Sequence, residues 1–176
     1  MLIPLSWLGE MVVLGGSPQA ICDALTGAGI EAEIAEDARP SWDGVVTAQL
    51  RSVQKHPDAD RLTVTRPFDG SVERTVVCGA TNHKEGDIVA LATHGTVLPG
   101  DFKIKKSKVR GVPSEGMLCS VAELGIGGDA AGILILPPGT PLGVPLSDVL
   151  EAGDVILDVS ATANRGDCLS VVGLAR

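Results

Sequence analysis

The feature that most constrains the fold is a series of short apolar runs in the middle of the chain. Between Trp42 and Leu136 these runs are separated by Gly, Pro, Asp and Asn, which favour turns. The expected strands are Val45–Val53, Leu62–Arg66, Arg74–Cys78, Ile88–Ala92, Phe102–Arg110, Met117–Cys119 and Ile133–Leu136. Short strands at such close spacing are typical of a small closed barrel or sandwich. The middle of the chain is therefore predicted to be a β-barrel.

The N-terminal segment has α/β character instead. Ser17 followed by Pro18 is a strong helix start, because serine caps the first turn and proline suits the first helical position. This helix is expected to run to about Leu25 and to end at the glycines that follow. A short strand at Ala32–Ile34 completes a unit that is too small to bury both faces on its own.

The C-terminal segment returns to α/β character. A strand is predicted at Val155–Val159, and a helix with Leu169 and Val172 on its apolar face at Cys168–Arg176. This helical pattern has no stop signal, so we expect the sequence to be a piece of a longer chain. The predicted fold class is α+β, a barrel inserted into a small split α/β domain. The expected boundaries are 1–39 and 151–176 for the two halves of the split domain and 40–150 for the barrel.

Charge and cysteine usage limit the function classes. Lys and Arg number 14 against 22 Asp and Glu, a net charge of −8, so any contact with a polyanion must come from a local patch. The N-terminus lacks the features of a signal peptide, and the charge-free stretch 130–147 holds four prolines, which exclude a membrane-spanning helix. The four cysteines are scattered, which favours buried, reduced thiols. These features predict a cytoplasmic protein without membrane contact.

Catalytic and metal sites have weak support in the sequence. Cys119 could be combined with His83 and His94 as a thiol-hydrolase set, but no nucleophile motif surrounds the cysteine. A zinc site that adds Cys78 lacks paired-ligand spacing. The glycine-rich segment 125–128 lacks the strand-to-helix context of a phosphate-binding loop. We therefore predict no catalytic residue, no metal ligand and no cofactor in this chain.

A basic run is the most unusual local feature of the sequence. Its members are Lys103, Lys105, Lys106, Lys108 and Arg110, five of the 14 basic residues. A continuous strand would turn some of them inward, so a bulge near positions 105–106 is expected, with Ile104 and Val109 inside. Two interpretations stay open: a stripe that contacts phosphates, or a solvated edge strand that lysines protect from aggregation.

A second cluster of donors surrounds a predicted turn. Lys55, His56 and Arg61 flank Pro57 and two aspartates, a turn-forming sequence between two expected strands. A turn that joins two barrel strands is where such small barrels bind oligonucleotides. The alternative is a surface loop whose charges pair with one another.

These motifs resemble the β subunits of bacterial phenylalanyl-tRNA synthetases. The middle is similar to their OB-fold tRNA-binding module, which also occurs in stand-alone tRNA-binding proteins. That similarity is carried by segments 56–62, 77–80, 98–100, 102–112 and 114–120. Segments 4–8, 164–170 and 173–176 are similar to the synthetase subunit specifically. Two positions depart from the family: Gly166 replaces the usual proline, and His94 stands where another residue is more frequent.

The resemblance implies a heterotetramer of two α and two β chains that joins phenylalanine to tRNA(Phe) with ATP and Mg²⁺. It places the aminoacylation site on the α subunit, and the editing site and anticodon-reading domain further along the β chain. This chain is then expected to be non-catalytic by itself and to need no cofactor. Its implied partners are tRNA(Phe), the α subunit and the rest of the β subunit.

Recognition of phosphate and RNA shape is the expected mode of contact. In the barrel only Phe68 and Phe102 could stack on bases, and Phe102 is expected in the core. The expected RNA-binding residues are Lys55, His56, Arg61, Lys103, Lys105, Lys106, Lys108 and Arg110. Two other functions stay open: an assembly module with little RNA contact, and a stand-alone tRNA-binding protein.

Overall fold

The computed structural model describes residues 1–128 and 132–176. The chain divides into two compact units, one formed by Met1–Arg39 with Ala152–Arg176 and the other by Pro40–Glu151. Strands dominate the described residues, and the α-helices among them are short, which confirms the predicted α+β class. We call the first the split unit and the second the barrel unit.

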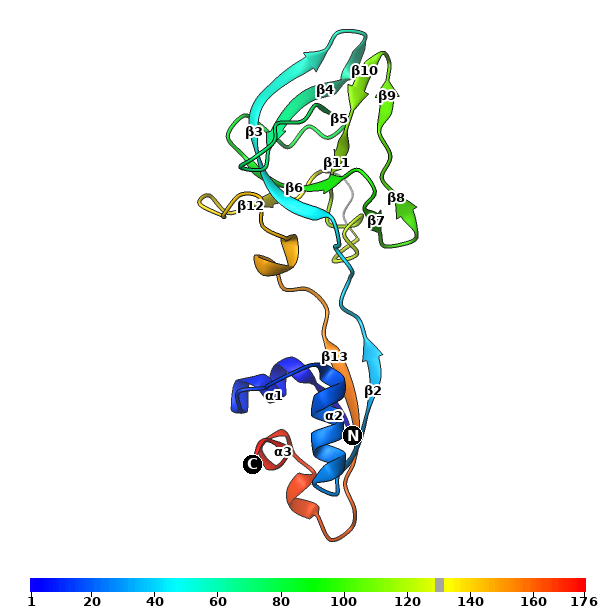
Figure 1. Ribbon diagram of the computed structural model, residues 1–176, viewed down its shortest axis with the longest axis vertical. Helices are drawn as coiled ribbons and strands as arrows, with labels where there is room; N and C mark the ends of the chain where they lie inside the picture. The colour runs from blue at the N-terminus through cyan, green and yellow to red at the C-terminus, as the bar shows by residue number, and fades with distance from the viewer. Residues whose placement is uncertain (129–131) are drawn as a thin grey trace. The chain divides into compact units, whose positions relative to one another are not determined.

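The split unit is built on a three-stranded antiparallel sheet in the order β1–β13–β2 (Figure 1). β1 (Leu2–Pro4) and β2 (Glu31–Asp37) come from the N-terminal segment, and β13 (Val155–Ser160) lies between them. Leu157 of β13 is paired with Ile3 on one side and Ile34 on the other. The sheet therefore joins residues from the two ends of the sequence.

Three α-helices supply the rest of the core of this unit: α1 (Leu5–Met11), α2 (Pro18–Gly27) and α3 (Val171–Ala175). The start of α2 is as predicted, since Ser17 Oγ accepts a hydrogen bond from Ala20 N at 3.3 Å. Apolar side chains from the helices and from the sheet pack together as one cluster. They are Ile3, Leu8, Ile21, Cys22, Ile30, Val155, Leu157, Val159, Cys168 and Leu174.

The predicted C-terminal helix is interrupted. A 3₁₀ turn, η2 (Gly166–Cys168), is followed by Ser170 in an extended conformation, which caps α3 by accepting a hydrogen bond from Gly173 N at 3.1 Å. This restart changes the helical phase, so the predicted apolar face was wrong. Leu169 and Val172 are 63% and 47% exposed, whereas Leu174 is buried.

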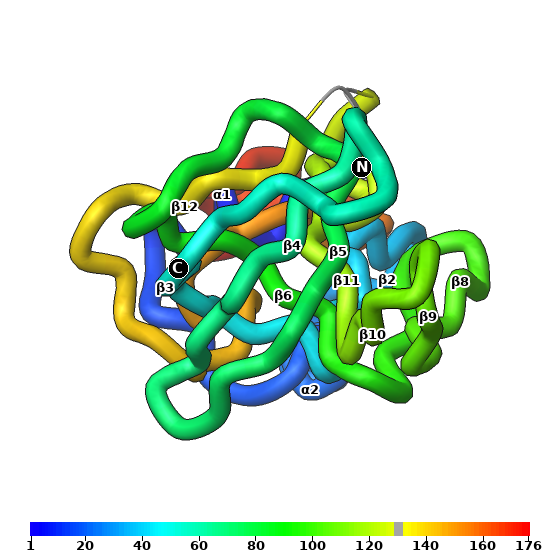
Figure 2. Tube along the Cα trace, turned by 90° about the horizontal axis from the view of Figure 1, so that it is seen from above, coloured from blue at the N-terminus to red at the C-terminus, as the bar shows by residue number. Residues whose placement is uncertain are grey.

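The barrel unit contains a six-stranded antiparallel sheet in the order β11–β6–β3–β4–β5, with β12 also paired to β6. The strands are β3 (Val45–His56), β4 (Ala59–Phe68), β5 (Val76–Cys78), β6 (Ile88–Thr93), β11 (Gly116–Leu118) and β12 (Ile135–Leu136). The ends of the sheet meet, since Glu115 N donates to Thr75 O at 2.9 Å and Val77 N donates to Ser114 Oγ at 3.2 Å. β5 and β11 accordingly lie side by side in Figure 2. The sheet is a nearly closed, OB-like barrel.

Aliphatic side chains fill the barrel. The members of its core cluster are Ala48, Leu50, Val76, Cys78, Val89, Leu91, Leu118 and Ile133. Trp42 is also buried, and its indole N–H donates to Leu124 O at 2.9 Å. A 3₁₀ turn, η1 (Leu146–Asp148), follows β12.

No helix in the described part of the chain is both long enough and apolar enough to span a membrane. The charge-free stretch 130–147 begins with two residues that lie outside the described ones. Its described remainder contains β12 and the start of η1.

Candidate nucleic-acid interface

The basic run forms two short strands with different partners, so the prediction of one bulged strand was wrong. β8 (Phe102–Lys103) pairs with β7 (Val97–Leu98), and β9 (Ser107–Val109) pairs with β10 (Val112–Ser114). Between them Ile104 is buried, as predicted, and its backbone N donates to Thr96 O at 2.8 Å. Because the chain changes partner here, all five cations of the run lie on the surface.

The β9–β10 hairpin ends in a strained two-residue turn. Val109 is paired with Val112, and both Arg110 and Gly111 between them have positive φ, 45° and 87°. These values fit a type I′ turn, which favours Asn-Gly. An arginine in the left-handed region costs about 1 kcal/mol. The tip of the hairpin is therefore occupied by an arginine in a backbone conformation that this residue type rarely adopts.

His56 is buried, which does not fit the expectation that it contacts RNA. Its exposed fraction is 4%, its Nδ1 accepts from Asp58 N at 3.1 Å, and its Nε2 lies 3.1 Å from Val109 O. Since Nδ1 accepts, Nε2 carries the proton and donates to Val109. His56 thus joins the end of the β3–β4 hairpin to the β9–β10 hairpin, and the two hairpin ends lie side by side (Figure 1).

This connection brings the turn at 55–61 next to the end of the basic run that holds Lys108 and Arg110. We call the exposed basic side chains of the two predicted clusters the cationic ridge. Its members are Lys55, Arg61, Lys103, Lys105, Lys106, Lys108 and Arg110. Among the ion pairs formed within residues 1–128 and 132–176, the ridge contributes one, between Lys106 Nζ and Glu115 Oε1 at 3.2 Å. The other members are available to a ligand, and the turn charges at 55–61 do not pair with one another.

The aromatic side chains differ from expectation in one respect. Phe102 is 55% exposed, because β8 is a two-residue strand on an outer hairpin, so its predicted core position was wrong. The Phe68 ring is covered by Arg51, whose guanidinium carbon lies 4.4 Å from the ring centroid. Phe102 is thus the one well-exposed aromatic ring in the described part of the barrel, and a single ring offers little surface on which bases could stack.

The described residues give no support to the thiol-hydrolase site or the zinc site considered from the sequence. All four cysteines are buried free thiols, as predicted. Burial raises the pKa of Cys119 to about 12, so this thiol is protonated at neutral pH. His83 Nε2 lies 3.0 Å from Thr63 Oγ1. The described residues contain no group of three or more His, Cys, Asp or Glu side chains that could hold a metal ion.

Comparison with known proteins assigns the barrel to a family. The family described as "Putative tRNA binding domain" matches residues 45–145, which include every member of the ridge. The phenylalanine–tRNA ligase beta subunits of Syntrophotalea carbinolica and Geobacter metallireducens are 53% and 49% identical over 176 residues. The chain belongs to this tRNA-binding-domain family. Each alignment covers 100% of this chain, flanks included, and 22% of the relative.

Membership of the tRNA-binding-domain family therefore covers the barrel, and similarity to ligase beta subunits extends over both halves of the split unit. A solved structure, the MetRS related protein from Pyrococcus horikoshii, is 20% identical and has a TM-score of 0.44. It covers 57% of this chain and 86% of that protein. The two structures agree too little to support a conclusion about this one.

Sequence reasoning did not place three side chains beside the ridge, although it considered one of them, His94, for a catalytic and a zinc site. Arg74, His94 and Glu115 line a pocket with Lys106. They come from separate parts of the chain, and barrel closure brings them together. The local sequence around each gives no signal of this meeting.

Proposed function

We propose that this chain is the N-terminal, tRNA-contacting region of a phenylalanine–tRNA ligase beta subunit. The observation that carries the proposal is the cationic ridge, whose members other than Lys106 have no ion-pair partner in the described part of the chain. It lies within the match to the tRNA-binding-domain family. The ridge contacts phosphates and the shape of a folded RNA, and the acidic remainder of the chain keeps this attraction short in range.

The proposal gives the chain a supporting part in a larger enzyme. That enzyme joins phenylalanine to tRNA(Phe) in the cytoplasm with ATP and Mg²⁺, as a heterotetramer of two α and two β chains. The chemistry takes place elsewhere in the assembly, and this region holds tRNA. The division into a split domain (1–39 and 151–176) around a tRNA-binding barrel (40–150) belongs to the same proposal. Alignment of both flanks with beta subunits favours a subunit over a stand-alone tRNA-binding protein.

Salt dependence of binding tests the ridge directly. The chain is titrated with tRNA(Phe) at several salt concentrations, as wild type and as the K105A/K106A/K108A variant. Loss of three phosphate contacts is expected to reduce the slope of log affinity against log salt by about two to three. Lys84→Ala, a lysine in the loop after β5 and outside the ridge, is the matched control. An unchanged slope in the triple variant would show that the run is a solvated edge.

A second candidate function, assembly, is favoured by the surface of the split unit. Trp7 and Met11 of α1 and Leu169 before α3 are 58%, 55% and 63% exposed. Because α1 packs against α3, we propose that these side chains form one apolar patch, the kind of surface that binds other proteins. We propose the rest of the beta subunit as the partner. The test is co-purification with the remaining part of the Syntrophotalea carbinolica beta subunit supplied separately, where W7S/L169S is expected to abolish capture.

A further inference from the structure

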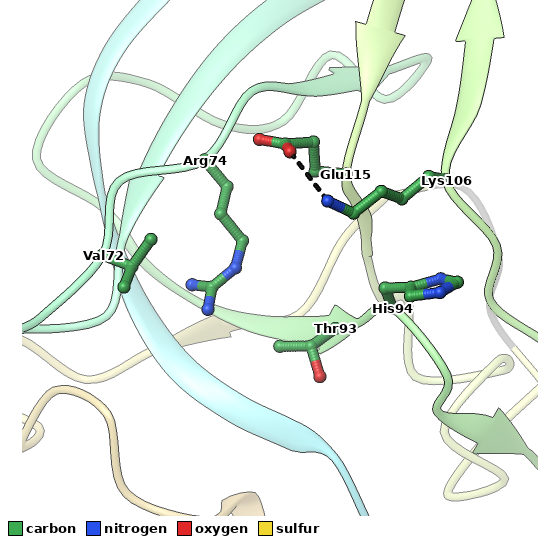
Figure 3. A pocket seen from close by; sticks show the side chains of 6 residues that line it. All are labelled: Val72, Arg74, Thr93, His94, Lys106 and Glu115. Carbon is green, nitrogen blue, oxygen red and sulfur yellow. Dashed lines mark hydrogen bonds and ion pairs between the residues drawn. The ribbon is translucent and has the colours of Figure 1, made fainter.

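A pocket of about 420 Å³ opens beside the ridge, at the place where the barrel closes (Figure 3). Arg74 and Glu115 come from the two segments that meet there, since Glu115 N donates to Thr75 O at 2.9 Å. His94 follows β6, and Gly95 N next to it donates to Ile104 O at 2.9 Å. Lys106 belongs to both the pocket and the ridge. The pocket is thus continuous with the proposed RNA-binding surface.

Nitrogen donors dominate the polar lining of this pocket. Figure 3 shows Arg74, Lys106 and His94 among the residues that line the pocket, with the Lys106 ammonium directed at Glu115. The Nη1 of Arg74 donates to the Asp69 carboxylate, which also accepts from Ser71 N at 2.9 Å and Val72 N at 2.7 Å. The Nε and Nη2 of Arg74 have no hydrogen-bond partner among the described residues. Arg74 is therefore held in place with donors to spare.

A second carboxylate, that of Glu115, pairs with Lys106. Its Oε1 lies 3.2 Å from Lys106 Nζ, and this hydrogen bond, together with the nearby Arg74 charge, lowers the pKa of Glu115. The Glu115 side chain is 39% exposed while its backbone N–H is bonded to Thr75. The side chain can therefore turn towards solvent without a change in the barrel. Thr93 adds no free donor, because its hydroxyl donates to Gly44 O at 2.9 Å.

We infer that this pocket binds a phosphate group of the RNA backbone, and that the Glu115 carboxylate occupies Lys106 until a phosphate replaces it. Arg74, Lys106 and His94 then supply three separate nitrogen donors, which suits the two free oxygens of a phosphodiester. An RNA strand that follows the ridge reaches the pocket at Lys106. The inference rests on the proposed function and explains why this one ridge cation is paired in the free protein.

The first test removes the competing charge. Glu115→Gln keeps an acceptor for Lys106 but loses the carboxylate, and it is expected to tighten tRNA(Phe) binding roughly twofold to fivefold, the size of one exposed charge pair. Glu85→Gln, an exposed glutamate in the loop before β6, makes the same change in net charge outside the pocket and is expected to have little effect. Equal effects of the two variants, or weaker binding by Glu115→Gln, would overturn the inference.

The second test removes a donor and uses a small probe. His94→Ala is expected to weaken tRNA(Phe) binding to a similar extent, and its thermal unfolding midpoint shows whether the fold is kept. Inorganic phosphate added to the wild-type chain is expected to shift the NMR signals of the Gly95 and Glu115 amides saturably, and to do so less in His94→Ala. Absence of these shifts in the wild type would overturn the inference.

The ridge variants separate the two proposals. K105A/K108A changes ridge residues that do not line the pocket. If it weakens binding while Glu115→Gln binds like Glu85→Gln and His94→Ala binds like the wild type, the pocket inference fails and the proposed function stands. If no variant changes binding, the proposed function fails and the inference fails with it.

Discussion

The barrel unit and the split unit present different surfaces to solvent. The barrel unit has 13 acidic and 11 basic residues, a net charge of −2, and gathers seven of its cations in the ridge. The split unit has nine acidic and three basic residues, a net charge of −6. It also exposes the large apolar side chains of Trp7, Met11 and Leu169. Under the proposed function, this difference assigns RNA contact to the barrel and protein contact to the split unit.

Core substitutions test most strongly whether the units are separable. Leu157 and Leu91 are fully buried, one in each unit. Leu157→Ala is expected to destabilise the split unit by about 2–5 kcal/mol through the cavity it leaves. It should leave amide protection in β3 and β6 and the affinity for tRNA unchanged. Leu91→Ala should lower protection in β3 and β6 and the affinity for tRNA, and should leave protection in the split unit unchanged. Hydrogen exchange followed by mass spectrometry reads both units at once. Loss of protection in both units from either substitution would show that they fold as one.

A somewhat smaller loss of stability is expected from substitution of His56. This substitution also tests whether the β3–β4 and β9–β10 hairpins contact RNA together. His56→Ala leaves Asp58 N and Val109 O without their partner, so we expect a loss of about 1–3 kcal/mol in unfolding free energy. Affinity for tRNA should fall too, because Lys108 and Arg110 are no longer held beside Lys55. Urea unfolding and tRNA titration measure the two effects. Lys55→Ala should lower the affinity for tRNA without a change in stability. If His56→Ala binds tRNA with full affinity, His56 does not position the ridge side chains.

Arg110 is expected to lower the stability of the barrel and to raise its affinity for tRNA. Arg110→Asn creates the Asn-Gly pair that a type I′ turn favours, so the barrel is expected to gain about 1 kcal/mol of stability. The same change removes a ridge cation and should weaken tRNA binding. A thermal unfolding scan and a binding titration on one preparation check both signs. If the variant is more stable but its affinity for tRNA is unchanged, Arg110 does not contact tRNA.

The smallest expected effect is a pH dependence confined to the barrel. Burial lowers the pKa of His83 below its ordinary value, in spite of the nearby Asp87. The unfolded chain therefore takes up this proton at a higher pH than the folded chain. Stability from His83 is complete above the ordinary histidine pKa and is lost as pH falls from about 7 to 5.

Unfolding midpoints at several pH values test this prediction. His83→Gln, which does not titrate, should flatten the barrel's response between about pH 7 and 5. All three histidines lie in the barrel unit, so protection in the split unit should stay level in this range. If the unfolding midpoint of the His83→Gln variant falls as much as that of the wild type over this pH range, other titrating groups cause the effect.

Features that depend on local sequence were predictable. The Ser17 cap, the start of α2 at Pro18 and the strand at β13 follow from a few adjacent residues. The surface position of the five cations was also predicted, because charged side chains are rarely buried without a partner, although the bulged strand expected to place them there was wrong.

Features that depend on distant partners were not predictable. The break of the basic run at Ile104 arises because β8 and β9 pair with different strands. His56 is buried by a contact with Val109, 53 residues away, although it lies in a segment, 55–61, that holds four charged residues. The pocket of Arg74, His94 and Glu115 exists only once the barrel closes. In the C-terminal segment, capping by Ser170 outweighed the apolar periodicity that predicted one continuous helix.

Hydrogen exchange of the chain with and without tRNA(Phe) at low salt most directly tests the division of labour between the units. Added tRNA is expected to increase protection in residues 53–62 and 103–116 and to leave 1–39 and 152–176 unchanged. The added protection should disappear as salt is raised, because phosphate contacts carry the binding. Protection that appears in the split unit, or that persists in the barrel at high salt, would contradict a barrel that holds RNA by charge.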